Sequence, residues 1–125
     1  MKIFITGVAG FLGSHLADLM LSQGHTVAGN DNMIGGYTDN VPQDVEFHQV
    51  DCCDLENMTK AMEGCDIVYH TAATAYEGLS VFSPVLVTRN IFEASVTTIT
   101  AAIRNKVKRI VYCSSMARYG HHDKM

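Results

Sequence analysis

The chain has 125 residues, of which 47% are hydrophobic and 18% are charged, and its formal net charge is −4. These values are ordinary for one globular domain, which at this length buries roughly two-thirds of its unfolded surface. The acidic balance argues against a nucleic-acid partner, and the lack of a run of roughly 18 apolar residues argues against a membrane span.

Cysteine and histidine usage gives no sign of a disulfide framework or a zinc site. The chain has four cysteines, Cys52, Cys53, Cys65 and Cys113, and no two of them form a C-x-x-C pair. This usage indicates a reducing, cytoplasmic environment with buried or half-buried thiols. The histidine cluster at 121–123 lies in a polar tail, where a loop is favoured over a metal site, so no metal is expected.

Strand-like and helix-like segments alternate from the first residue onward. Five strands are expected, at about 2–6, 26–31, 45–50, 66–70 and 109–113. Three helices are expected between them, at about 11–23, 55–63 and 84–105. Asp54 is expected to cap the second helix, and Pro84 suits the first turn of the third. The first helix is expected to bury an apolar stripe of Phe11, Leu12, Leu16, Leu19 and Met20.

This alternation predicts an α/β fold with a doubly wound parallel sheet of about five strands. Strand–helix–strand units with right-handed crossovers place helices on both faces of such a sheet. A ligand is then expected across the carboxyl ends of the strands, at the point where the strand order reverses. The fold class is therefore of the Rossmann type.

Three glycines follow the first strand at a spacing of three: Gly7, Gly10 and Gly13. Where a strand turns into a helix, the first glycine permits the sharp turn, the second leaves room for a pyrophosphate, and the third allows close helix packing. The helix N-terminus then faces the phosphates with its free N–H groups. The alternative is a strand–turn–helix that merely packs well.

Asp31 ends the second predicted strand, 18 residues after Gly13. A carboxylate at this position accepts hydrogen bonds from the adenosine ribose hydroxyls of a dinucleotide, and it repels a 2′-phosphate. The pair of motifs therefore predicts NAD rather than NADP as the cofactor. The alternatives are that Asp31 only forms a turn, or that the chain is an NADP-dependent reductase.

These motifs resemble the extended short-chain dehydrogenase/reductase family, and within it the UDP-glucose 4-epimerase-like NAD-dependent sugar-nucleotide epimerases and dehydratases. The segment Thr6–Gly13 resembles its TGxxGxxG motif, and the segment 70–73 resembles its H-x-A-A stretch. The segment 107–115, followed by Tyr119-Gly120, resembles VKRxVYxSS…YG. The resemblance covers the chain from Met1 to about Gly120.

The resemblance implies a set of cofactor-binding residues: Gly7, Gly10, Phe11, Leu12, Gly13, Asp31, Asn32, Asp51, Cys52, Thr71, Ala72, Ala73 and Asn90. It implies that Asp51 and Cys52 contact the adenine. It also implies that Ser115 is catalytic and hydrogen-bonds the sugar oxygen that is oxidised. Taken alone, Asp51 could begin a turn, the alanines could mark a tight strand exit, and Ser115 could cap a helix.

The sequence departs from the family pattern at three points. The general base of the family is a tyrosine with a lysine four residues on, expected roughly two dozen residues after Ser115, and no Tyr-x-x-x-Lys occurs in these residues. Glu93 replaces a small residue or an amide, which leaves the register around Asn90 open by one position. Ala75 stands where some epimerases place a lysine.

Two functions are therefore considered. The first is the NAD-binding portion of a sugar-nucleotide epimerase or dehydratase that acts by transient hydride transfer. Residues 1–125 would then be the N-terminal part of the NAD-binding domain, without the substrate domain and inactive alone. The alternative is a non-catalytic NAD-binding sensor or interaction module without the Tyr–Lys pair.

The last predicted strand, at 109–113, is apolar and lacks a neighbour on its outer side. Such an edge can pair with another chain. We therefore expect a homo-oligomer, formed through this edge or an exposed helix face.

Overall fold

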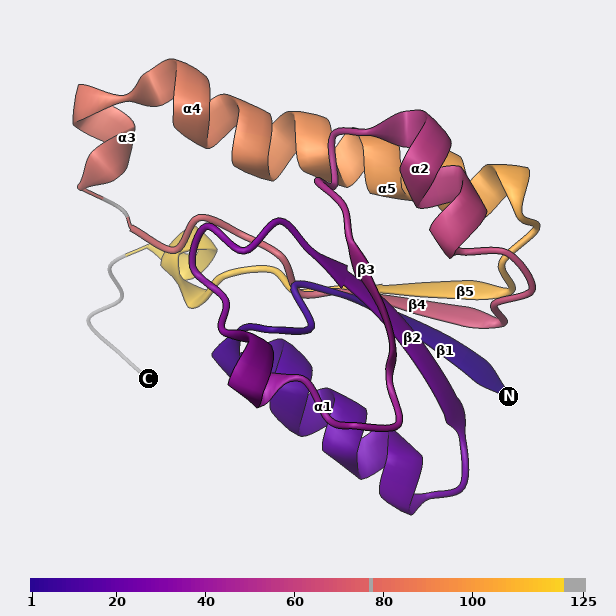
Figure 1. Ribbon diagram of the computed structural model, residues 1–125. Helices are drawn as coiled ribbons and strands as arrows, with labels where there is room; N and C mark the ends of the chain where they lie inside the picture. The colour runs from indigo at the N-terminus through magenta and orange to yellow at the C-terminus, as the bar shows by residue number, and fades with distance from the viewer. Residues whose placement is uncertain (77, 121–125) are drawn as a thin grey trace.

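The computed structural model describes residues 1–76 and 78–120. Its centre is an all-parallel sheet with the strand order β3-β2-β1-β4-β5 (Figure 1). The strands are β1 (Lys2–Thr6), β2 (Thr26–Asp31), β3 (Glu46–Gln49), β4 (Ile67–His70) and β5 (Arg109–Tyr112). The order reverses between β1 and β4, because the chain builds outward from β1 first on one side and then on the other.

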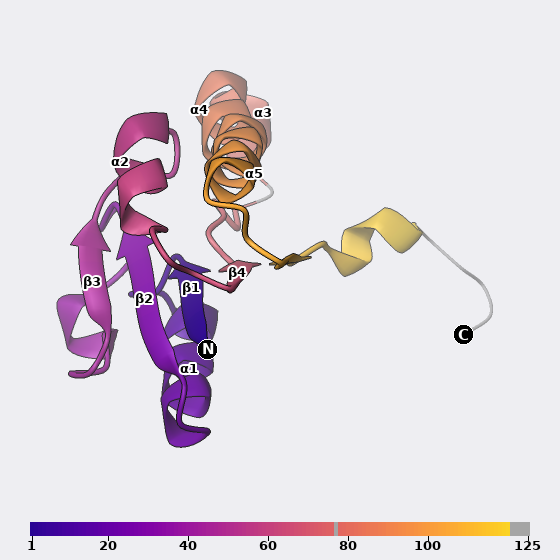
Figure 2. The same ribbon diagram turned by 90° about the vertical axis from the view of Figure 1, so that its right-hand side faces the viewer.

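Helices cover both faces of the sheet (Figure 2). Helix α1 (Phe11–Ser22) lies on one face, while α2 (Leu55–Ala61) and α5 (Ala94–Arg104) lie together on the other. The remaining elements are α3 (Leu79–Phe82), α4 (Pro84–Thr88), the π-helical η2 (Arg89–Glu93) and two short 3₁₀ turns, η1 (Thr38–Asn40) and η3 (Met116–Tyr119). The predicted doubly wound Rossmann-type fold is confirmed.

Each face of the sheet has its own apolar core. Because successive side chains of a strand point to opposite faces, β1 supplies Ile3 and Ile5 to one core and Phe4 to the other. The α1 core also contains Val27 and Met20, and the opposite core contains Met58 and Met62 of the α2 region, among others. Strand β1 is thus buried on both sides and fixes the layers around it.

The apolar stripe predicted for α1 is wrong in three of its positions. Phe11 is 81% exposed, and Leu12 and Leu19 are also exposed. The buried residues of α1 are instead Gly13, Ser14, Ala17 and Met20. The helix lies so close to the sheet that small side chains must face it, and the larger apolar ones remain on the outer surface.

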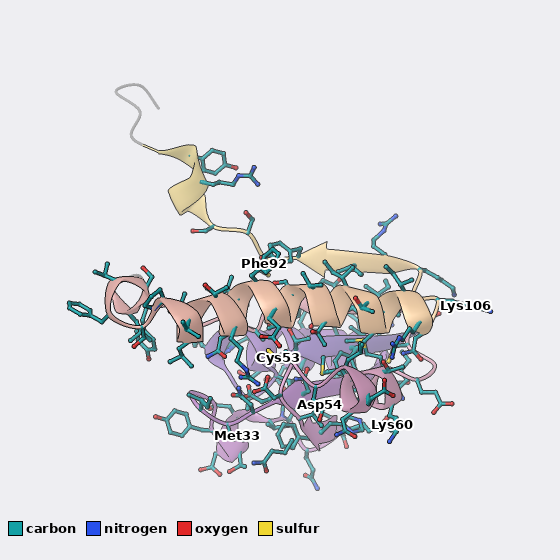
Figure 3. All side chains as sticks on the ribbon, turned by 90° about the horizontal axis from the view of Figure 1, so that it is seen from above. Met33, Cys53, Asp54, Lys60, Phe92 and Lys106 are labelled. Atoms are coloured by element: carbon teal, nitrogen blue, oxygen red, sulfur yellow. The ribbon has the colours of Figure 1, made fainter. Side chains whose placement is uncertain are left out.

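The residues predicted at the starts of two helices lie where they were expected. Asp54 accepts a hydrogen bond from the Asn57 N–H at 3.1 Å, and Pro84 begins α4. Asp54 and Lys60 lie near the two ends of α2 (Figure 3). The predicted helix at 84–105 is one helical run in which the five residues of η2 have π geometry.

The thiols differ from the prediction at one position. Cys52 and Cys65 are buried and Cys53 is half-buried, but Cys113 is exposed. Within the described ranges, no group of three or more His, Cys, Asp and Glu side chains could hold a metal ion, and the cluster at 121–123 lies outside them. No helix in the same ranges is long and apolar enough to cross a bilayer.

Gly13→Ala is expected to lower the free energy of unfolding by about 3 kcal/mol, the upper range for overpacking. A Cβ atom at Gly13 would lie 2.2 Å from the Gly7 carbonyl oxygen, and backbone cannot rotate away as a side chain can. Urea denaturation measures the change. The matched control is Gly78→Ala, whose Cβ would meet nothing within 4 Å, and equal losses in both variants would contradict the prediction.

Candidate functional site

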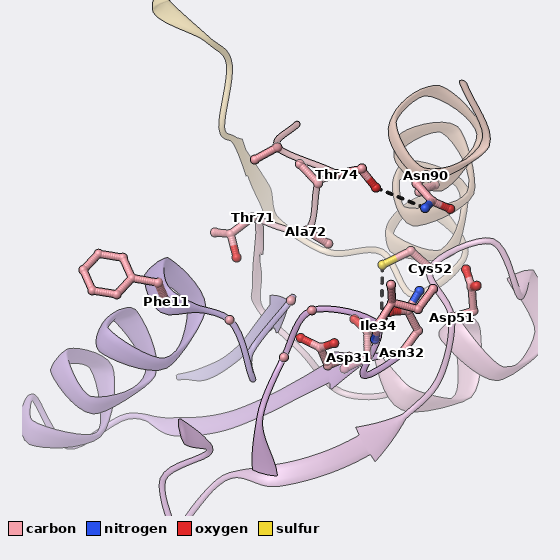
Figure 4. Close-up of a pocket in the computed structure, with 18 of the residues that line it drawn as sticks. Phe11, Asp31, Asn32, Ile34, Asp51, Cys52, Thr71, Ala72, Thr74 and Asn90 are labelled. Atoms are coloured by element: carbon pink, nitrogen blue, oxygen red, sulfur yellow. Dashed lines mark hydrogen bonds between the residues drawn. The ribbon is translucent and has the colours of Figure 1, made fainter. Parts of the chain in front are cut away.

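A cavity of about 450 Å³ opens at the carboxyl ends of β1, β2 and β4, where the strand order reverses (Figure 4). Sequence segments far apart meet there, because parallel strands end at the same edge of the sheet. Of the residues predicted to bind the cofactor, those that line it are Gly7, Gly10, Phe11, Asp31, Asn32, Asp51, Cys52, Thr71, Ala72, Ala73 and Asn90. Leu12 and Gly13 do not line it, and Ser115 lies elsewhere.

The glycine turn after β1 forms the floor of the cavity. Gly7 has a φ of 69°, in the left-handed region that favours glycine, and its N–H donates to the Asn30 carbonyl at 2.7 Å. Gly10 is the N-cap of α1 and offers no side-chain cap. The first N–H groups of α1 therefore face the cavity, a geometry suited to an anion.

Asp31 lies at the end of β2 with its carboxylate held by the backbone. One oxygen, Oδ2, accepts from the Ala9 N–H at 3.2 Å, and Oδ1 accepts from the Met33 N–H at 2.8 Å. A Cβ atom at Gly36 would lie 2.7 Å from the Ala9 Cβ and 3.0 Å from the Asp31 Cγ, so glycine lets this loop pass close to the acid. The carboxylate keeps further lone pairs for a ligand hydroxyl.

The segment after β3 contributes a second acid. Asp51 accepts the Cys53 N–H at 2.8 Å and forms an ion pair with Arg89 of η2 at 3.0 Å. Burial pushes the pKa of Asp51 upward, but the Cys53 N–H and the Arg89 guanidinium outweigh it and hold that pKa below its usual value. Asp51 is therefore an anion at the rim of the cavity at neutral pH.

Cys52 lies deeper on the α5 side. Its sulfur accepts a hydrogen bond from the Asn30 amide at 3.2 Å, and burial raises the pKa of the thiol. The same Asn30 amide nitrogen donates to the Val50 carbonyl at 2.9 Å. Cys52 is thus a fixed, neutral wall of the cavity rather than a reactive thiolate.

The π-helical η2 decides where Asn90 points. Its amide donates to the Thr74 hydroxyl at 3.1 Å across the cavity (Figure 4). A π turn accommodates one additional residue in a helix, and such turns often occur at functional sites. The position at which the sequence leaves the register open by one residue, around Asn90, lies within this turn.

A second cavity, of about 540 Å³, lies beside the first and contains Ser115 among its lining residues. Tyr112, Cys113 and Ser114, at the end of β5 and just after it, also line it. The segment 71–76 lines both cavities and forms the wall between them. The proposed catalytic hydroxyl therefore lies across this wall from the glycine turn.

Several lining residues were not predicted from the sequence. Thr74 and Tyr76 belong to the loop after β4, and Ile34 belongs to the loop after β2. Arg89 is not a lining residue, but it reaches the lining residue Asp51 from η2. Only their place in the chain could have predicted these lining residues, because the loops after β2 and β4 leave the sheet at the edge where a ligand is expected. The Arg89–Asp51 pair had no sequence signal, because 38 residues separate its partners.

The sequence from residue 3 to residue 125 matches the model of the "NAD dependent epimerase/dehydratase family". The chain belongs to this family. The resemblance noted from the sequence motifs is thereby confirmed. The family description names enzymes, so the alternative of a non-catalytic NAD-binding module is not favoured.

Curated relatives of this NAD-dependent epimerase/dehydratase family member include proteins named as 4-epimerases of nucleotide sugars. The chain is 33% identical over 134 residues to the "Probable UDP-arabinose 4-epimerase 3" of Arabidopsis thaliana, covering 98% of this chain and 33% of that protein. It is 32% identical to the UDP-glucose 4-epimerase of Corynebacterium glutamicum, covering 98% of this chain and 37% of that protein. The chain spans about a third of the length of these relatives.

Solved structures give the same family relationship. The UDP-glucose 4-epimerase of Thermotoga maritima, solved with UDP-glucose, superposes with a TM-score of 0.94 at 29% identity, covering 100% of this chain and 41% of that one. The Thermus thermophilus UDP-glucose 4-epimerase complex with NAD gives 0.88 at 34% identity, covering 92% and 38%. Epimerases of known structure therefore contain the fold described above.

Arg89→Gln is expected to raise the pKa of Asp51 toward its usual value, because the guanidinium that stabilises its anion is lost. The partners are 43% and 30% exposed, so the cost in stability stays below about 1 kcal/mol. A carboxyl carbon NMR titration measures the pKa. Arg104→Gln breaks the similar surface pair with Glu56 and serves as the control; an unchanged Asp51 titration in Arg89→Gln would contradict the prediction.

Proposed function

We propose that the chain is the NAD-binding portion of a nucleotide-sugar 4-epimerase, with residues 1–125 forming the N-terminal part of its NAD-binding domain. The observation that carries this proposal is the cavity in which the glycine turn, the α1 N-terminus and the Asp31 carboxylate meet. Family membership and the NAD complex of a Thermus thermophilus relative support it.

The residues present fit a dinucleotide. The N–H groups at the start of α1 and the bare Gly7 and Gly10 would accept a pyrophosphate. Asp31 would accept the ribose hydroxyls. On the far side of the cavity, Asp51 and Cys52 would hold the adenine, and Asn90 would fix the loop at Thr74.

NAD, when bound, would supply a hydride acceptor that returns the hydride to the keto-sugar. The task of this chain is to orient the partners. Ser115 would hydrogen-bond the reacting sugar oxygen from the second cavity and hold it for proton transfer. A nucleotide sugar is the proposed substrate of the whole protein, in keeping with the UDP-glucose found in a structural relative. The four free cysteines are in keeping with a cytoplasmic location.

Isothermal titration is expected to show NAD binding at least about tenfold tighter than NADP, because a 2′-phosphate would face the Asp31 carboxylate. Asp31→Ser removes this charge and is expected to reduce the preference for NAD. Asp44→Asn removes an exposed acid that does not line the cavity and is the matched control. Tighter NADP binding by the unaltered chain would overturn the cofactor assignment.

We also propose that the chain forms a homo-oligomer. Strand β5 is an edge of the sheet, and Val111 and Tyr112 are partly exposed along it. The helical run of α4, η2 and α5 adds exposed apolar side chains such as Phe92, on the side away from α2 (Figure 3). An unpaired apolar strand edge is a template for another chain.

Light scattering after size exclusion is expected to give a mass above that of one chain, rising with concentration. Val111→Lys places a charge on the β5 edge and is expected to lower the mass if the edge is the contact. Phe92→Lys tests the helix face in the same way, and Ile34→Lys, on an exposed loop, is the control. A clean monomer of the unaltered chain at high concentration would refute the oligomer.

A further inference from the structure

His70 is a buried imidazole to which the proposed function assigns no task. It is the last residue of β4 and is 3% exposed. The segment 71–76, which begins immediately after it, forms the wall between the two cavities. Whatever fixes the start of this segment therefore sets the shape of both cavities.

The hydroxyl of Thr6 connects His70 to that wall. Thr6 Oγ1 accepts hydrogen bonds from the Thr71 N–H and the Ala72 N–H, both at 3.1 Å, and lies 2.8 Å from His70 Nδ1. A hydroxyl has two lone pairs and one proton. Because the two amides occupy both lone pairs, the hydroxyl proton must donate to His70 Nδ1. Nδ1 therefore carries no proton.

The other ring nitrogen completes the assignment. His70 Nε2 lies 3.0 Å from the Ser95 oxygen on α5, and the Ser95 hydroxyl donates to the Ile91 carbonyl in η2. Since the Ser95 proton is used there, Nε2 must carry the proton and donate it to Ser95. The donors therefore follow one direction: the Thr6 hydroxyl donates to Nδ1, Nε2 donates to Ser95, and Ser95 donates to the Ile91 carbonyl in η2.

The surroundings of the ring favour this neutral form. Thr6 faces it from β1, Ser95 from α5 and Tyr112 from β5, with the His70 and Tyr112 ring centroids 5.5 Å apart. Just after β5, Cys113 donates its backbone N–H to the His70 carbonyl at 3.2 Å. Burial lowers the pKa of His70 below its usual value.

We propose that His70 is a positioning residue. As the neutral, Nε2-protonated tautomer, it holds the Thr6 hydroxyl in the orientation that fixes the wall at Thr71 and Ala72. Protonation of His70 releases this wall and weakens NAD binding. The part concerning NAD rests on the proposed function. A proton on Nδ1 would need a lone pair of Thr6, so one of the two amides would lose its acceptor.

A released wall would disturb the glycine turn directly. A Cβ atom at Gly7 would lie 2.9 Å from the Ala72 Cα, so the two backbones are already in close contact. The Thr71 hydroxyl also donates to the Thr6 carbonyl, at the last residue of β1. A shift of the wall is therefore felt at the turn that would receive the pyrophosphate.

The first experiment needs no ligand and no variant. At 125 residues the chain is small enough for NMR, and ring ¹⁵N shifts distinguish the two neutral tautomers of His70 from the cation. We expect the Nε2-protonated form at about pH 7.5. We also expect the Thr71 and Ala72 amides to lose protection as His70 becomes protonated, measured against the intrinsic exchange rate at each pH. An Nδ1-protonated or cationic ring at about pH 7.5 would overturn the proposal.

The second experiment titrates NAD calorimetrically from about pH 7.5 to about pH 5. The affinity is expected to be constant while His70 is neutral and to fall about tenfold as pH drops through its pKa, which burial holds below the usual value of about 6.5. Such a fall corresponds to the loss of about one hydrogen bond to the part-buried Thr71 or Ala72 amide. His70→Phe is expected to bind about tenfold more weakly at the higher pH and to lose this component of the pH profile.

Three further variants separate the network from general damage. Thr6→Val removes the hydroxyl and is expected to reproduce the His70→Phe profile, while Thr6→Ser restores the hydroxyl and the unaltered profile. Thr100→Val removes an exposed hydroxyl on α5 and is the matched control. The same pH profile in the unaltered chain and Thr6→Val would overturn the proposal.

The two hypotheses fail in different ways. If the unaltered chain binds no NAD at any pH, the proposed function fails, and the positioning role is decided by the tautomer and amide exchange alone. If NAD binds but neither Thr6 nor His70 affects its pH dependence, the proposed function stands and the positioning role is wrong.

Discussion

The backbone of α1 touches the backbone of the turn that precedes it, and the cavity is built around this contact. At Gly13 there is no room for a Cβ beside the Gly7 carbonyl, and at Gly29 in the neighbouring strand a Cβ would lie 2.6 Å from the Ile5 carbonyl. The first contact draws the N-terminus of α1 down to the sheet. Its unpaired N–H groups then face the edge where the strands end, and the anion site follows from packing.

The parallel sheet supplies the remaining parts of the site without any long-range pairing signal. Every strand runs in the same direction, so the residue after each strand reaches the same edge. Successive residues of β2 then contact different parts of the site. Asp31 faces the glycine turn beside α1, whereas Asn30, one residue earlier, reaches Cys52 on the side of α5.

The sequence predicted what depends on local pattern. Strand positions, the Asp54 cap, the Pro84 helix start and the glycine turn follow from periodicity, turn chemistry and backbone sterics. The structure has them close to the expected residues. The exposed face of α1 was mispredicted, because periodicity assumes that large apolar residues face the core. Here the separation of helix and sheet is set by glycine, and Ala17 faces the sheet while Phe11 faces outward.

Other features had no local signal at all. The π geometry of η2 interrupts an otherwise regular helical run, and periodicity alone does not distinguish it from an α-helix. The Arg89–Asp51 ion pair and the Thr6–His70 hydrogen bond join residues 38 and 64 positions apart. The segment 70–73 could be matched to a family motif from the sequence. Which atom donates each hydrogen bond around His70 could be assigned only from the interatomic distances.

One wall with two cavity faces has a thermodynamic consequence. Ligands seated on opposite sides of the segment 71–76 act on a single piece of backbone, so the energy with which one occupant shifts it is also felt by the other. Linkage makes this influence reciprocal: whatever the first occupant does to the affinity of the second, the second does equally to the first. The affinities of the two cavities are thus coupled through the short backbone segment that they share.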